Sequence, residues 1–425
     1  LAKVGFFASG NIYFRNRYFA DISYRTSGSS AYGSENRFAP MWSFGLGWNL
    51  HKEKFLDDIE WIDVMRLTWS WGYNGQTTGS PYQAITTYRY DNKNMYYTGV
   101  GTVPIRMGNP ELKWQRVLKN NIGIDLTLFK ERLVVSFDYF RNTTKDQLMS
   151  IPLPASTGAE NITVNFGENQ NTGYDFSVAA QIIRTPKWAW TSVINGSHVK
   201  DRIKRISNTL KNTSYQVDLD SPLMLRFQEG GSQYDIYAVR SAGIDPATGQ
   251  EIFIKKNGEY TFKYDTEDEV VVGNTQPELQ GTWLNTLRYK GWSLNFVFSY
   301  TFGGDTYNKT LWEKVENIDP RYNVDERAFT DRWKRPGDLS RYLAIRQTTQ
   351  TYNSERFVER LNELWLSSAT ISYEFQAKFL KRLGFKRLAV GVGVTDLVRF
   401  SSVKYERGTS YPYSRTINLM LRPTF

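Results

Sequence analysis

The chain has 425 residues, of which 53 are basic and 43 acidic, so its formal net charge is +10. It contains no cysteine, which excludes disulfides, thiolate nucleophiles and cysteine-based metal sites. No run of residues approaches the ~18 consecutive apolar positions of a transmembrane helix, whereas a β-barrel, whose strands only alternate, stays compatible with the composition.

Alternation of apolar and polar residues between turn residues predicts about thirteen strands. In chain order they cover residues 1–14, 18–26, 42–50, 62–72, 119–129, 132–142, 173–184, 188–199, 280–290, 291–301, 365–375, 384–397 and 413–425. Most have about ten or more residues, twice the usual soluble strand and close to what a tilted strand needs to cross a bilayer. The first strand begins without Met or a signal-peptide pattern, which predicts that the chain is part of a longer protein.

The segment NIGIDLTLFKERLVVSFDYF (residues 121–140) shows the alternation most clearly. Apolar residues occupy every second position over 122–128 and again over 133–139. Between the two runs, Lys130 and Glu131 leave room for a tight hairpin turn only. The apolar face points inward in a soluble sandwich and outward, to lipid, in a membrane barrel.

The connections between the predicted strands alternate in length. The short ones are 15–17, 51–61, 130–131, 185–187, 290–291 and 376–383. The long ones are 27–41, 73–118, 143–172, 200–279, 302–364 and 398–412. This sorting is the up-and-down pattern of outer-membrane barrels, with short periplasmic turns and long extracellular loops. It places the C-terminus, which ends in Phe425 like a barrel-closing strand, at the periplasmic side.

No nucleophile-elbow, nucleotide-binding or zinc-binding motif is present, and His51 and His198 are the only histidines. We therefore expect no enzyme. The stretch KDRIKRISNTLK (residues 200–211) is the one approach to a basic face, and an anionic lipid surface or a protein partner suits it better than nucleic acid.

One acidic cluster could hold calcium, because hard cations take several carboxylate oxygens. Its members are Asp265, Glu267, Asp268 and Glu269. Their spacing matches no calcium-loop motif, so a solvated acidic face is the simpler interpretation, and no other metal or cofactor is expected.

If the apolar faces meet lipid, the opposite faces line an aqueous lumen. The lumen-facing candidates are Asp125, Asp138, Asp175, Asn295 and Asn418. A polar lining suits the passage of hydrophilic solutes, although any one of these side chains could merely solvate a wall or pair with an interior plug.

Several blocks, in order along nearly the whole chain, resemble the SusC/RagA-like TonB-dependent transporters of Bacteroidetes outer membranes. Residues 22–48 resemble a strand–loop–strand block of that family, and the hairpin at 121–140 and the terminal strand at 411–425 are similar to others. NPELKWQ (residues 109–115) resembles the family's N-P-x-L-K-W-E, with Gln in place of Glu. DRWKRPGD (residues 331–338) is similar to its R-W-x-x-P-G-D segment.

The resemblance implies that residues 1–425 form the C-terminal part, about thirteen antiparallel strands, of an all-β transmembrane barrel of about 22 strands. Long extracellular loops would lie at 73–118, 143–172, 200–279 and 302–364. It further implies the outer membrane of a Gram-negative bacterium, a SusD-like surface lipoprotein as lid, and import of an oligosaccharide or a peptide. TonB would engage the N-terminal portion that carries the plug and lies outside these residues.

Aromatic side chains in the long loops are the candidates for contact with a ligand or with the lid. They are Tyr73, Tyr82, Tyr88, Tyr234, Tyr237, Trp312 and Trp333. Packing within the loops is the alternative for each, and the Pro-Gly-Asp turn beside Trp333 favours a structural anchor there. A passive porin, a barrel enzyme and a secreted β-rich glycan-binding protein are the alternative functions, and the sequence does not separate sugar from peptide as substrate.

Overall fold

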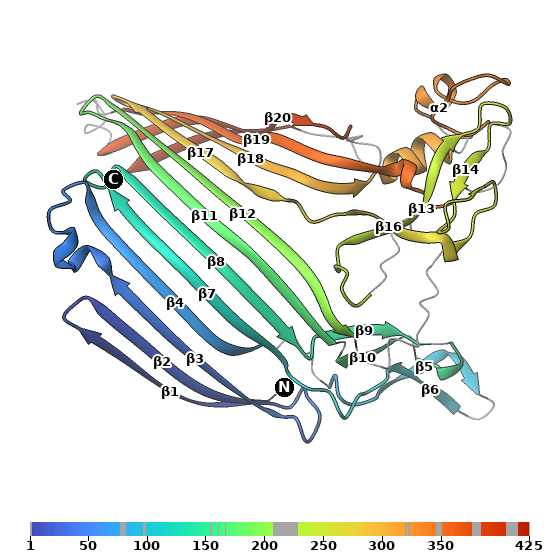
Figure 1. Ribbon diagram of the computed structural model, residues 1–425, viewed down its shortest axis with the longest axis horizontal. Coiled ribbons are helices and arrows are strands. Elements are labelled where there is room, and N and C mark those ends of the chain that lie inside the picture. Colours follow the sequence, from blue (N-terminus) through green and yellow to red (C-terminus); the bar gives the residue numbers. More distant parts are fainter. Residues whose placement is uncertain are drawn as a thin grey trace. The chain divides into compact units, whose positions relative to one another are not determined.

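The computed structural model describes residues 2–76, 82–96, 99–153, 155–159, 161–165, 167–206, 228–318, 321, 324–345, 351–375, 384–404 and 415–424. Its main element is a 13-stranded antiparallel sheet whose strands are hydrogen-bonded in chain order (Figure 1). The strands are β1 (Lys3–Phe14), β2 (Tyr18–Ser29), β3 (Phe38–Asn49), β4 (Ile62–Gln76), β7 (Gln115–Leu128), β8 (Leu133–Lys145), β11 (Gly167–Arg184), β12 (Trp188–Ile206), β17 (Leu279–Tyr289), β18 (Trp292–Tyr307), β19 (Val358–Phe375), β20 (Arg387–Ser401) and β21 (Thr416–Thr424).

The chain forms two compact units. The first comprises residues 1–176, 200–214 and 227–231, and the second residues 177–199, 215–226 and 232–425. Each unit holds part of the large sheet together with smaller elements from the long connections. In the part of the chain that the structure describes, no helix is long and apolar enough to cross a membrane.

The long connections carry secondary structure of their own, which the strand pattern did not predict. In the first unit they form the pairs β5 (Thr87–Tyr96) with β6 (Gly99–Arg106) and β9 (Leu148–Pro152) with β10 (Asn161–Asn165), and the 3₁₀ turns η1 (Leu50–Lys52), η2 (Lys54–Leu56) and η3 (Ala155–Thr157). In the second unit they form a sheet in the order β15 (Tyr260–Thr261), β14 (Glu251–Ile254), β13 (Asp235–Ile244), β16 (Glu269–Asn274). The turn η4 (Thr266–Asp268), the π-helix η5 (Leu311–Glu316), the helix α2 (Arg327–Thr330) and the turn η6 (Glu355–Phe357) complete this unit.

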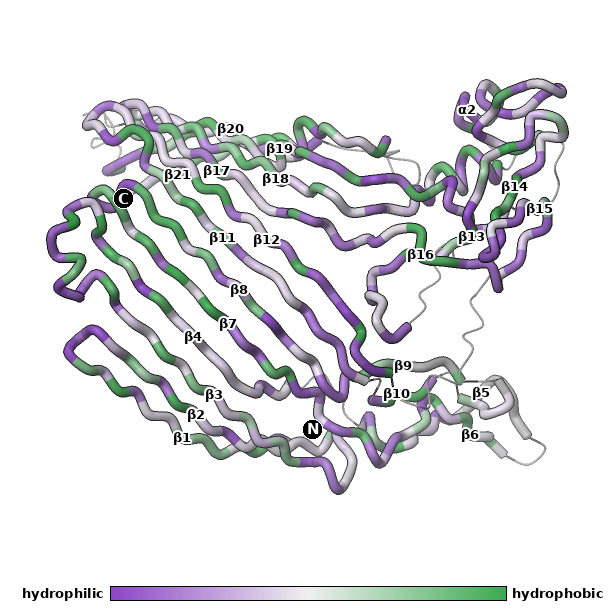
Figure 2. Tube along the Cα trace, viewed as in Figure 1, coloured by the Kyte–Doolittle hydropathy of each residue, from purple (hydrophilic) through white to green (hydrophobic). Residues whose placement is uncertain are grey.

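The register of β7 and β8 gathers their apolar side chains on one face of the sheet. Ile122 lies opposite Tyr139, and Ile124 lies opposite Phe137, and residues that face each other across two strands share a side of the sheet. Ile122 is 52% exposed and Phe137 40%. These rings and branched chains are therefore exposed on one face of the sheet and are not packed into a dry core. Figure 2 shows the alternation of hydrophobic and hydrophilic residues as changing colours along the strands.

The opposite face of the same hairpin is polar and hydrogen-bonded from strand to strand. Asp125 lies opposite Ser136, whose hydroxyl donates to the carboxylate at 2.9 Å. The Asn121 amide donates to Asp138 at 3.2 Å. Cross-strand bonds of this kind let carboxylates line a sheet face without being left unpaired.

The turn between these strands is longer than the sequence suggested. β7 ends at Leu128 and β8 begins at Leu133, so four residues form the connection and the predicted two-residue hairpin is wrong. Phe129, Lys130 and Glu131 all have positive φ, at 58°, 58° and 63°. The alternation continues up to the turn, and for that reason the pattern alone could not show where pairing stops.

Most strands extend further into the long connections than predicted. β11 begins at Gly167, β12 continues to Ile206 and β19 begins at Val358. Most of their added residues are polar, so the alternation that marks the central part of each strand does not continue regularly through them. The terminal Phe425, residues 376–383 of one predicted turn and residues 207–227 of the longest loop lie outside the described residues.

Two glycines of β3 offer a matched test of the packing on the polar face. A Cβ built on Gly47 would lie 1.7 Å from the Phe19 ring that covers it, whereas one on Gly45 would meet its nearest neighbour, Asp21 Cβ, at 3.7 Å. We expect Gly47→Ala to lower the free energy of unfolding by about 1–3 kcal/mol, because overpacking displaces the ring. Gly45→Ala should leave stability unchanged or slightly higher. Urea unfolding, followed by the gel mobility of the unheated protein, measures both, and equal effects would contradict the ring-over-glycine packing.

Candidate functional site

The second unit contains a polar wall built from parts of β17 to β21. Asn295 lies opposite Thr370, Thr370 opposite Gly393, and Gly393 opposite Asn418, so these residues form one row across four strands. The next row runs from Ser293 through Ser372. These side chains line a cavity of about 800 Å³, whose polar lining can hydrogen-bond water and hydroxylated solutes.

Charged residues lie at the turn end of this wall. Arg288, Lys290, Glu374 and Arg422 border the same cavity. The other face of these strands is apolar, because Leu294, Ile371, Val392 and Leu419 form a row of their own. The two-sided pattern of the first unit is thus repeated in the second.

The remaining lumen candidates lie on the sheet of the first unit. Asp125 and Asp138 are partly exposed and hold the cross-strand bonds described above, and Asp175 of β11 is exposed. The position of all five candidates in an aqueous lumen stays a prediction.

The NPELKW segment (residues 109–114) fastens the loops of the first unit together. Leu112 is fully buried and Trp114 is 3% exposed. Trp114 stacks on Tyr32 at a centroid distance of 4.6 Å, and its indole N–H donates to the carbonyl of Arg37 at 2.9 Å. The backbone of Gly33 donates to Leu112 O at 3.1 Å. This segment therefore ties its own connection to the loop between β2 and β3.

The same segment also binds the β9–β10 pair. Asn109 donates through its amide to the carbonyl of Thr163 at 3.1 Å. Lys113 N donates to Asn165 Oδ1 at 2.9 Å, and Asn165 Nδ2 donates back to Lys113 O at 3.1 Å. A reciprocal side-chain and backbone pair of this kind fixes the register of two loops. The motif therefore joins three connections: its own, the loop between β2 and β3, and the connection that contains β9 and β10.

A buried ion network organises the loops of the second unit. Arg356 contacts Glu251 at 2.9 Å and Glu316 at 3.3 Å, and Glu251 and Glu316 are each only 4% exposed. Burial lowers the pKa of Arg356, but the attraction of the two carboxylates outweighs it, so the pKa lies above its usual range. Arg332 is also buried and donates to the carbonyls of Leu343, Val315 and Glu316.

The segment DRWKRPGD (residues 331–338) forms a fixed turn against a second turn, DPATG (residues 245–249). The Trp333 indole donates to Pro246 O at 2.8 Å. Gly249 has φ +73°, and a Cβ there would lie 2.6 Å from the Trp333 ring. The Asp338 carboxylate accepts the amides of Lys334 and Arg335. The bond from the Arg335 amide is the main reason why the pKa of Asp338 lies below its usual range.

The loop aromatics predicted from the sequence separate into exposed and packed rings. Tyr82, Tyr88 and Tyr234 are 62%, 64% and 46% exposed. Tyr73 packs edge-on against Trp42 at 5.8 Å and is half-buried, as is Trp333. Tyr237 and Trp312 are 6% and 8% exposed, so these two rings pack inside the loops and offer no open face for a ligand.

The acidic cluster does not converge on one point. Asp265 accepts the amide of Glu267 at 2.9 Å, and Asp268 accepts the amide of Lys256 at 3.0 Å. Glu269 is buried and accepts the Tyr264 hydroxyl at 3.2 Å. Across the described residues, no group of three or more acidic or histidine side chains is arranged to hold a metal ion.

The two histidines lie apart from any cluster of this kind. His51 Nδ1 lies 3.2 Å from Met65 O, and His198 Nδ1 lies 2.5 Å from Glu278 O. The Nδ1 atom of each histidine thus contacts a backbone carbonyl.

A groove of about 1120 Å³ in the second unit was not predicted from the sequence. Its walls come from five separate stretches of the loops, represented by Gln250, Tyr264, Arg335, Leu343 and Tyr352. Of these stretches, only 331–338 carried a motif in the sequence. Residues that are far apart in the chain and meet only through folding have no fixed spacing, so the groove could not be predicted from the sequence.

The family model described as "TonB dependent receptor-like, beta-barrel" matches residues 2–397. TonB-dependent receptor P39 of Formosa agariphila is 25% identical over 92% of this chain and 41% of its own length. TonB-dependent receptor P3 of the same organism is 28% identical over 94% and 41%. TonB-dependent receptor SusC of Bacteroides thetaiotaomicron is 24% identical over 88% and 38%. The chain spans about two fifths of the length of these curated relatives.

Solved structures of the RagAB peptide transporter are similar in fold. One has a TM-score of 0.83 at 22% identity, covering 94% of this chain and 44% of that chain. The "closed-closed" and "open-open" states have TM-scores of 0.80 and 0.78. At this level of identity the likeness concerns the fold alone.

Substitutions at two neighbouring residues test whether the NPELKW segment (residues 109–114) holds the loops of the first unit together. We expect Leu112→Ala to destabilise the loops of the first unit by about 2–5 kcal/mol, because it leaves a cavity in their core. Limited proteolysis should then cut residues 30–37 or 109–114 faster, while the large sheet stays folded. Glu111→Ala changes an exposed neighbour and is the control, so its loops should be cleaved at the original rate. Unchanged cleavage in Leu112→Ala would show that the segment does not hold these loops.

Proposed function

Because this chain belongs to the TonB-dependent receptor-like β-barrel family, we propose that it supplies wall and loops of an outer-membrane transporter that imports a nutrient. The observation that carries this proposal is the two-faced sheet. Its apolar side chains are exposed on one face, and its polar side chains are hydrogen-bonded to each other on the opposite face. That arrangement suits lipid on one side and water on the other.

Further strands would complete the barrel. Among the described strands, β1 and β21 each have one hydrogen-bonded neighbour in the large sheet. Unpaired backbone groups are not tolerated in the hydrocarbon region. The relatives are more than twice as long as this chain. We therefore place the remaining strands, the plug and the TonB contact in other parts of the full protein.

In the proposed mechanism, the solute is captured between the long loops and a SusD-like surface lipoprotein that acts as a lid. It then passes down the polar wall after the plug rearranges, with energy delivered through TonB. The chain's own residues would bind and guide the solute: exposed loop rings such as Tyr82, Tyr88 and Tyr234 by contact, and Asn295 and Asn418 by hydrogen bonds along the wall. The substrate in this proposal is an oligosaccharide or a peptide, and no chemical step is assigned to the chain.

Adjacent residues of β7 test which face meets lipid, and the absence of native cysteine makes the labelling clean within this chain. We expect Asp125→Cys to react with a water-soluble maleimide in the folded, membrane-embedded protein. Ile124→Cys should resist that reagent, and a fluorophore attached there before reconstitution should be quenched by brominated lipid. The reverse pattern would place the polar face in lipid and would overturn the proposal.

Energised import is separated from passive diffusion by the proton-motive force. Cells that carry the full-length protein should take up the nutrient, and a protonophore or loss of TonB should abolish the uptake. A passive channel would keep transporting down the concentration gradient under both conditions. Uptake that continues after TonB is removed would therefore exclude the proposed mechanism in favour of a porin.

A further inference from the structure

The groove in the loops of the second unit has walls of aromatic rings. Tyr264 and Tyr352 stack face to face, with centroids 4.3 Å apart and planes 8° apart. Tyr352 is 45% exposed and Phe262 54%, and both line the groove with Trp333. One face of Tyr352 lies on Tyr264, so its exposed surface is held in one orientation. Flat, fixed rings are suited to stacking on the apolar faces of sugar rings.

A buried glutamate is also among the residues that line the groove. Glu251 is 4% exposed, and its Oε2 is held by Arg356 at 2.9 Å. Its other oxygen, Oε1, is buried and has no hydrogen-bond partner among the described residues. A buried acceptor without a partner is costly, and a ligand hydroxyl or N–H that donates to it would remove that cost.

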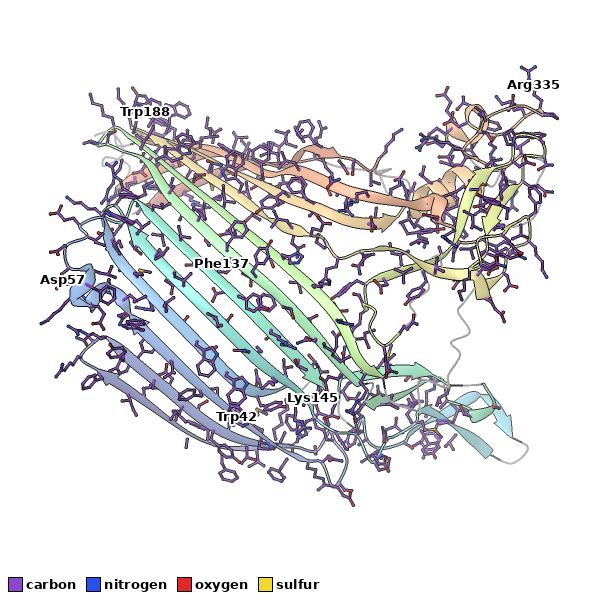
Figure 3. All side chains as sticks on the ribbon, in the orientation of Figure 1. Trp42, Asp57, Phe137, Lys145, Trp188 and Arg335 are labelled. Atoms are coloured by element: carbon purple, nitrogen blue, oxygen red, sulfur yellow. The ribbon has the colours of Figure 1, made fainter. Side chains whose placement is uncertain are left out.

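The exposed charges on the groove are all basic. Lys263, Lys334 and Arg335 line it and are exposed. The Asp338 carboxylate holds the backbone amides of Lys334 and Arg335, so the turn that carries these two side chains is fixed. Arg335 projects away from the ribbon at the tip of this loop (Figure 3). Such cations attract carboxylate and sulfate groups by charge-assisted hydrogen bonds.

From these three features we propose that the groove binds an acidic oligosaccharide, one whose sugar rings carry carboxylate or sulfate groups. The rings stack on Tyr352 and Phe262, a sugar hydroxyl donates to Glu251, and the acidic groups pair with Lys334 and Arg335. This proposal deepens the proposed function by naming the substrate class, and it rests on that function only for the claim that the bound sugar is imported.

The backbone of the groove favours a sugar over an acidic peptide. An extended peptide gains affinity by adding a strand to an open sheet edge. The strand that lines the groove, β14, is paired with β13 on one side and with β15 on the other. Because Phe253 and Ile254 pair with β15, only Glu251 and Ile252 of this strand are left on that side, which is too short an edge for an extended peptide main chain.

The test measures binding of four matched probes to the full-length protein in detergent by isothermal titration calorimetry. The probes are hexagalacturonate, a sulfated galactan hexamer, neutral maltohexaose and a hexaglutamate peptide. We expect one of the two acidic sugars to bind at least tenfold more tightly than maltohexaose, with an affinity that falls as salt is added. Whichever acidic sugar binds more tightly identifies carboxylate or sulfate as the recognised group.

Variants of the groove separate the contribution of its basic charges to affinity from that of ring stacking. Lys334→Ala combined with Arg335→Ala should weaken the acidic sugar about tenfold and leave the neutral sugar unchanged. Tyr352→Ala should weaken both sugars. The control combines Lys256→Ala with Lys314→Ala, which removes the same charge from two exposed positions outside the groove, and it should change neither affinity.

Equal affinity for acidic and neutral sugars, tighter binding of hexaglutamate, or an equal loss in the control variant would each overturn the groove proposal. Uptake assays distinguish its failure from that of the proposed function. Binding without TonB-dependent uptake would keep the groove and overturn the transporter proposal. TonB-dependent uptake of the sugar that is unaffected by the groove variants would do the opposite.

Discussion

The alternation of side chains along paired strands is the constraint on which the rest of this structure depends. Each strand satisfies its backbone groups only through its neighbours, so every residue's side is fixed once the register is fixed. In β7 and β8 this puts Ile124 beside Phe137 and Asp125 beside Ser136. A shift of one residue would send the carboxylates to the apolar face, and the cross-strand hydrogen bond between Ser136 and Asp125 resists that shift. The pairing of the strands therefore maintains the apolar and the polar face of the sheet without a packed hydrophobic core.

The loops lack the long ladders of backbone hydrogen bonds that hold the sheet, so side chains must fix their conformation. The two units use different kinds of side-chain contact. In the first unit, Leu112 and Trp114 form a small apolar core closed by backbone bonds. In the second, buried charges do the same work: Arg356 joins two carboxylates, and Arg332 joins backbone carbonyls. A buried ion pair adds little net stability but is specific in geometry, which suits loops that must present a surface in one arrangement.

Strand positions were predictable from the sequence because a period of two is a local signal, and all thirteen strands of the large sheet occur where the alternation predicts them. The family match and the fold likeness confirm the resemblance and the all-β barrel class. The loop surfaces were not predictable in the same way. Tyr237 and Trp312 are candidates for ligand or lid contact with packing inside the loops as the alternative, and both are buried. A ring in a polar loop has the same appearance in the sequence whether it packs or projects. Tyr352 was missed because its partner, Tyr264, lies in a different connection.

The ion network and the groove share one side chain, and this links the stability of the loops to recognition. Glu251, which lines the groove, uses one carboxylate oxygen to hold Arg356, and its other oxygen is buried without a hydrogen-bond partner among the described residues. If the pair served stability alone, a well-packed apolar residue would serve as well or better. Arg356 also donates to the carbonyl of Arg341, at the base of the stretch that carries Leu343 and Ala344 to the groove wall. The same guanidinium thus orients the acceptor and fixes the wall beside it, which is the arrangement expected where a binding surface must be rigid before its ligand arrives.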